Sequence, residues 1–99
     1  MTMLLIPIDS PLTIIQEHQD PLEVMGRYGG KGQPITLTVG HPEHPTCKVW
    51  AFVDPVYSGV NPRARRALEL LAAVHMVFTG PVLFTDLEAS VADDLMESL

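Results

Sequence analysis

The most regular alternation of apolar and polar positions lies in the middle of the chain. In ITLTV, residues 35–39, every second residue is aliphatic and the residues between are threonines. The alternation returns in CKVWAFV, residues 47–53, where the four odd-numbered residues share one face. Because side chains alternate between the two faces of a strand, both stretches predict strands, joined through residues 41–46.

Two further stretches extend this predicted sheet. Residues 22–27 place Leu22 and Val24 on one face, and the glycines of residues 29–32 suit a tight loop. These features predict a three-stranded antiparallel meander around residues 22–53. The apolar run at residues 3–8 predicts another strand, either central in the sheet or covered on both faces.

Residues 11–28 have a second interpretation. Asp20 followed by Pro21 resembles a helix start, and a helix here would give a ferredoxin-like βαββαβ order plus a C-terminal helix. Residues 10–15 are equally open, because Ser10-Pro11 resembles a helix start whereas the following β-branched residues suit a strand. Both alternatives are kept.

The second half of the chain predicts two helices. Asn61 and Pro62 resemble an N-cap and first helical residue, and apolar residues at helical spacing follow to about residue 78, before Gly80-Pro81. Residues 82–84 predict a short extended piece. Thr85 with Glu88 resembles a capping box for a helix at about 86–97. The prediction is a single α+β domain over residues 1–99.

The composition indicates the class of protein and its cellular compartment. Apolar residues make up 46% and charged residues 18% of the 99 residues, which is typical of a globular domain. One cysteine allows no internal disulfide. The first ten residues lack the basic start of a signal peptide. The longest apolar run, 70–78, is interrupted by His75 and is too short to cross a membrane. We therefore expect a cytoplasmic protein with no membrane partner.

The segment HPEHPTC, residues 41–47, holds the candidate metal ligands His41, His44 and Cys47. Histidine and cysteine are zinc donors, and a cysteine near histidines also suits nucleophilic catalysis. The proline after each histidine favours extended backbone, however, which separates ligands three residues apart by roughly 9 Å. We favour a stiff strand connection without a cofactor, and keep a metal-dependent or Cys/His enzyme centred here, with His75 as a further ligand, as the alternative.

Charged residues are unevenly distributed along the chain, with a cluster of acids near the C-terminus. The net charge of −6 argues against direct nucleic-acid binding. Five acids and no base lie between residues 86 and 99, and the one dense basic patch comes earlier. The acids are Asp86, Glu88, Asp93, Asp94 and Glu97, and the bases are Arg63, Arg65 and Arg66.

These charges, with no recognisable catalytic constellation, predict a small non-enzymatic interaction module. It would regulate or inhibit a larger protein complex, and its acidic helix could occupy a basic, nucleic-acid-binding groove of the partner. A structural subunit of an assembly is a further alternative.

Trp50 and Phe52 add a prediction about self-association. They lie on the face of their strand opposite Cys47 and Val49, so that both faces carry apolar side chains. An uncovered aromatic face is costly in water, and a twofold partner would cover it. We therefore expect a homodimer, which weakens at high salt if the acidic and arginine clusters meet across the axis.

Overall fold

The computed structural model describes residues 2–8, 10–15, 19–27, 33–41, 44–53, 60–72 and 76–99. At positions 33, 34, 41, 44–46, 52 and 53 the description covers the backbone alone. The elements are, in chain order, β1 (Thr2–Ile6), β2 (Thr13–Ile15), α1 (Pro21–Arg27), β3 (Gln33–His41), β4 (His44–Val53), α2 (Pro62–Ala72), β5 (Val82–Leu87) and α3 (Ala89–Ser98).

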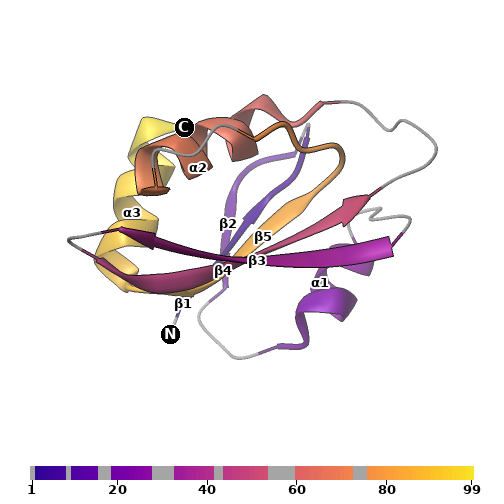
Figure 1. Ribbon diagram of the computed structural model, residues 1–99, viewed down its shortest axis with the longest axis horizontal. Helices are drawn as coiled ribbons and strands as arrows, with labels where there is room; N and C mark the ends of the chain where they lie inside the picture. Colours follow the sequence, from indigo (N-terminus) through magenta and orange to yellow (C-terminus); the bar gives the residue numbers. More distant parts are fainter. Residues whose placement is uncertain are drawn as a thin grey trace.

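The five strands form one antiparallel sheet in the order β2-β1-β5-β4-β3. Helices α2 and α3 lie over one face and the short helix α1 lies over the other (Figure 1). The α+β class is therefore confirmed. The succession of elements also contains the β-α-β-β-α-β order of the alternative prediction followed by its C-terminal helix, with β2 as an additional strand.

Two apolar clusters hold the layers together. The larger one joins α2 and α3 to the sheet residues that face them, among them Leu4, Val49 and Phe84. The smaller one consists of Met3, Leu5, Val24, Met25 and Leu83, on the α1 side. Both β1 and β5 contribute to both clusters because alternate side chains point to opposite faces, and such strands belong in the middle of a sheet.

Residues 11–28 contain both a strand and a helix. Thr13–Ile15 is strand β2, whereas Pro21–Arg27 is helix α1, so the predicted first strand of the meander at 22–27 is wrong. The Asp20 carboxylate accepts a hydrogen bond from the Leu22 amide at 3.0 Å, which caps the helix. Val24 and Met25 are adjacent and both buried, a pattern that suits one side of a helix and not one face of a strand.

Helix α2 begins as predicted. Asn61 is fully buried, and its side-chain oxygen accepts a hydrogen bond from the Ala64 amide at 3.1 Å. The predicted end near residue 78 is wrong, because the helix ends at Ala72 and residues 76–78 are not helical. Val60 instead forms an isolated antiparallel β-bridge with Thr79, and the backbone N–H of Asn61 donates to the Phe78 carbonyl at 2.8 Å. These contacts hold the segment before β5 beside the start of α2.

The last strand is longer than predicted, and α3 begins later. Thr85 belongs to β5, and the N-cap of α3 is Glu88, whose side chain makes no capping hydrogen bond; the predicted capping box is therefore wrong. The register between β1 and β5 shifts between Thr2 and Leu4, and Asp86 has a φ of 62°. This bulge inserts one residue, which returns Leu87 to the side of Phe84, where both are buried under the helices.

Candidate functional site

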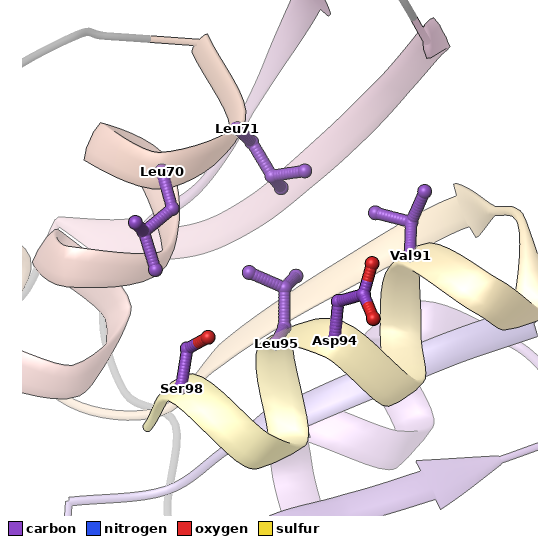
Figure 2. A pocket seen from close by; sticks show the side chains of 6 residues that line it. All are labelled: Leu70, Leu71, Val91, Asp94, Leu95 and Ser98. Carbon is purple, nitrogen blue, oxygen red and sulfur yellow. The ribbon is translucent and has the colours of Figure 1, made fainter.

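A groove lies between α2 and α3. It encloses about 200 Å³. Leu70 and Leu71 project into it from α2, and four residues of α3 face them (Figure 2). These four are Val91, Asp94, Leu95 and Ser98.

Helical spacing explains how the groove is lined. Asp94, Leu95 and Ser98 follow Val91 by three, four and seven residues along α3, so the four share one side of that helix. Leu71 is buried, but the neighbouring Leu70 is 47% exposed. An exposed leucine beside a buried one widens the apolar face of α2 beyond what the sheet covers. The adjacent leucines were a signal of this in the sequence, but neither Leu70 nor Ser98 was among the predicted site residues.

The predicted acidic residues fall into separate groups. Asp93, Asp94 and Glu97 are exposed on α3, and Asp94 stands at the groove itself. Asp86 lies at the bulge in β5, and Glu88 lies at the N-cap of α3. Within the described part of the chain, none of the five carboxylates has a basic side chain within ion-pair distance.

The three arginines make contacts within the chain. The Arg63 guanidinium donates to the carbonyls of Pro7, Ile8 (3.3 Å) and Ser10 (2.6 Å), so it anchors the connection after β1. Arg65 pairs with Glu69 at 3.2 Å.

Arg66 donates to the Ser98 carbonyl at 3.4 Å, at one end of the groove. The three residues thus point to three different places, and Arg66 alone stands near the groove.

The two aromatic residues of β4 differ in what the structure shows. Trp50 is half-buried, packs against the smaller cluster and donates its indole N–H to the Thr85 hydroxyl at 3.1 Å. The side chain of Phe52 lies outside the described residues. Trp50 is thus partly covered by α1 and its neighbours, and a homodimer formed through Trp50 and Phe52 stays a prediction.

The HPEHPTC segment spans the β3–β4 connection. The backbones of His41 and His44 are opposite each other in the ladder, while their side chains, residues 42–43 and His75 lie outside the description. Cys47 is 5% exposed and belongs to the larger cluster.

Burial, with a smaller contribution from the Asp86 charge, raises the pKa of the Cys47 thiol. Zinc binding and nucleophilic attack both use the thiolate, which a raised pKa disfavours. Among the residues whose side chains are described, no group of three potential metal ligands occurs.

No protein-family model matches this sequence, and neither the curated proteins nor the solved structures give a significant match. No helix in the described ranges is long and apolar enough to span a membrane.

Proposed function

We propose that this chain is a non-enzymatic protein-interaction module that regulates or inhibits a larger protein, and that it binds through the α2–α3 groove. The observation that carries the proposal is the combination of an apolar groove with an exposed carboxylate, Asp94, in its lining. The matching partner segment is amphipathic and basic. It would place an aliphatic or aromatic side chain beside Leu70 and a lysine or arginine beside Asp94.

The two parts of this surface have different roles. Apolar contact in the groove supplies affinity, since Leu70, which is 47% exposed, loses its remaining hydration on binding. The exposed carboxylate of Asp94 mainly accelerates encounter and selects a basic partner. A basic partner segment of this kind also suits phosphate binding, so its binding to the α2–α3 groove would compete with nucleic acid. A single buried cysteine fits action in the reducing cytoplasm.

The test is affinity capture from extracts of the source cell with four forms of the chain. Wild type is compared with Asp94→Lys and Leu70→Ser, which alter the charge and the apolar part of the groove. Glu23→Lys is the matched control, because it makes the same change of charge at an exposed position of α1, on the other face of the sheet. Circular dichroism verifies that all four are folded.

We expect one protein to be captured by wild type and by Glu23→Lys, and lost with both groove variants. Its capture should also fall between ~50 mM and ~300 mM salt, since exposed charges are screened within a Debye length. Recovery of the same proteins with all four forms, or of none above the bare matrix, would refute the proposal.

A further inference from the structure

The two edges of the sheet are very different. At one edge, β2 has three residues, whereas at the other, β3 has nine. Within the ranges that the structure describes, β4 is the one strand paired with β3, so the outer side of β3 has no strand partner (Figure 1). Nine residues extend roughly 30 Å, and their outward N–H and C=O groups form a template for another strand.

Strand β3 lacks most of the features that protect such an edge. Residues 33–41 contain no lysine, arginine, aspartate or glutamate. The register shift near its end places Pro45 and Thr46 of β4 opposite Gly40, so the extra residue lies in β4 and β3 continues regularly. Pro34, which has no amide hydrogen, blocks only the start of the strand.

We propose that the outer edge of β3 pairs with β3 of a second copy of this chain, antiparallel and about a twofold axis at Leu37. The stretch Ile35–Val39, ITLTV, is close to a palindrome. The axis sets Thr36 opposite Thr38 of the second copy, and Ile35 opposite its Val39. Threonine therefore faces threonine and an aliphatic side chain faces another aliphatic one, which suits an interface between two identical surfaces.

The surroundings of β3 favour a second copy over an unrelated strand. Ile35, Leu37 and Val39 are only partly buried and already pack against the larger cluster, so their copies would extend that apolar layer across the axis. Thr36 and Thr38 are exposed on the other face, where facing threonines form favourable cross-strand pairs. Strands β3 and β4 contain one charged residue, Lys48, apart from their histidines, so two chains of net charge −6 meet where neither carries acid.

This inference does not rest on the proposed function. The residues that line the α2–α3 groove all belong to the two helices, and β3 lies at the edge of a different layer. Light scattering after size-exclusion chromatography, with sedimentation equilibrium for the dissociation constant, tests it on the full chain. Three variants are compared with wild type: Thr36→Lys/Thr38→Lys, Thr36→Lys/Thr38→Glu, and Thr13→Lys in the short edge strand as the control for adding lysine to an edge.

The proposed register predicts how strongly wild type and each of the three variants should dimerise. Wild type and Thr13→Lys should show twice the monomer mass at micromolar concentration. The double-lysine variant should dissociate roughly tenfold more readily or more, because two pairs of like charges face each other. The lysine–glutamate variant should recover dimerisation, because each lysine then faces a glutamate. Circular dichroism and thermal melting identify any variant that fails to fold.

Three results would overturn the inference: a monomeric wild-type chain, a dimer that the double-lysine variant leaves unchanged, or a lysine–glutamate variant as dissociated as the double-lysine one. If the double-lysine variant does not fold, hydrogen exchange of wild type at two concentrations decides. Amides of residues 35–39 should then exchange more slowly at the higher concentration, and equal exchange would equally overturn the inference.

Discussion

The side chain of Asn61 joins three parts of the chain that are far apart in the sequence, and its replacement by alanine should be strongly destabilising. Its side chain is fully buried. The amide nitrogen donates to the Ile6 carbonyl at 2.8 Å and to the Gly80 carbonyl at 2.9 Å. Its oxygen caps α2 at the Ala64 amide. The residue thus connects the end of β1, the start of α2 and the turn before β5.

The magnitude follows from these contacts. Loss of an N-cap costs about 1 kcal/mol. Each buried carbonyl left without a donor costs about 1–3 kcal/mol, though a carbonyl that gains a water recovers part of this. For Asn61→Ala we expect a loss of about 3–5 kcal/mol in the free energy of unfolding, a large share of the stability of a domain of this size. Urea denaturation followed by Trp50 fluorescence and circular dichroism measures it.

Two companion variants separate the cap from the two donated bonds. Asn61→Ser keeps a capping oxygen but cannot reach both carbonyls, so its loss should be smaller than that of alanine by about 1 kcal/mol. Glu88→Ala is the matched control, because Glu88 is the N-cap of α3 but makes no side-chain capping bond; its loss should stay within about 0.5 kcal/mol.

Asn61→Asp adds a pH test. A carboxylate there faces two carbonyl oxygens in a buried site, which raises the pKa of the new carboxyl in the folded state. Its stability should therefore be highest below the unfolded pKa of about 3.9 and fall relative to wild type as pH rises. The reasoning is refuted if Asn61→Ala loses less than about 1.5 kcal/mol with an unchanged denaturant slope, or if Asn61→Asp shows no such dependence.

Three other predictions use neighbouring features. Leu68→Ala should cost about 2–5 kcal/mol, whereas Leu70→Ala, on the exposed side of α2, should cost under about 0.5 kcal/mol; similar losses in urea titrations would show that the assigned buried face is wrong. Asp86→Gly should leave thermal stability unchanged or higher, and Asp86→Val should cost about 1–2 kcal/mol, because the positive φ is unfavourable for a β-branched residue; the reverse order would contradict the bulge. The raised pKa of the Cys47 thiol predicts stability that is retained below the usual thiol pKa of about 8.5 and lost above it, relative to Cys47→Ala; identical alkaline profiles of the two proteins would count against it.

The sequence by itself determined those elements whose signals lie within a few residues of one another. Alternation at residues 35–53 predicted the β3–β4 hairpin, in which Ile35 pairs with Ala51 and Leu37 with Val49. Asn61-Pro62 marked the start of α2. Asp20-Pro21 marked α1 equally well, but the alternation of Leu22 and Val24 competed with it, and a period-two pattern over six residues is too short to exclude a helix.

Tertiary structure decided the arrangement of these elements and the role of several polar residues. Strand β5 lies at the centre of the sheet, yet its last residues resembled a helix start in the sequence. Their extended conformation depends on the pairing of Leu87 with Thr2, and no local pattern contains a pairing between residues so far apart. The same holds for Thr85, which accepts a hydrogen bond from Trp50, and for Arg63, which holds carbonyls more than fifty residues away.

The groove between α2 and α3 could not be predicted from the sequence for the same reason. The acidic residues of α3 were recognisable as a local charge run, but the presence of Leu70 opposite Leu95 depends on how α2 and α3 cross over the sheet. Short-range patterns report the periodicity of one element. The surface between two elements is set by which apolar faces meet, and that depends on the packing of the whole chain.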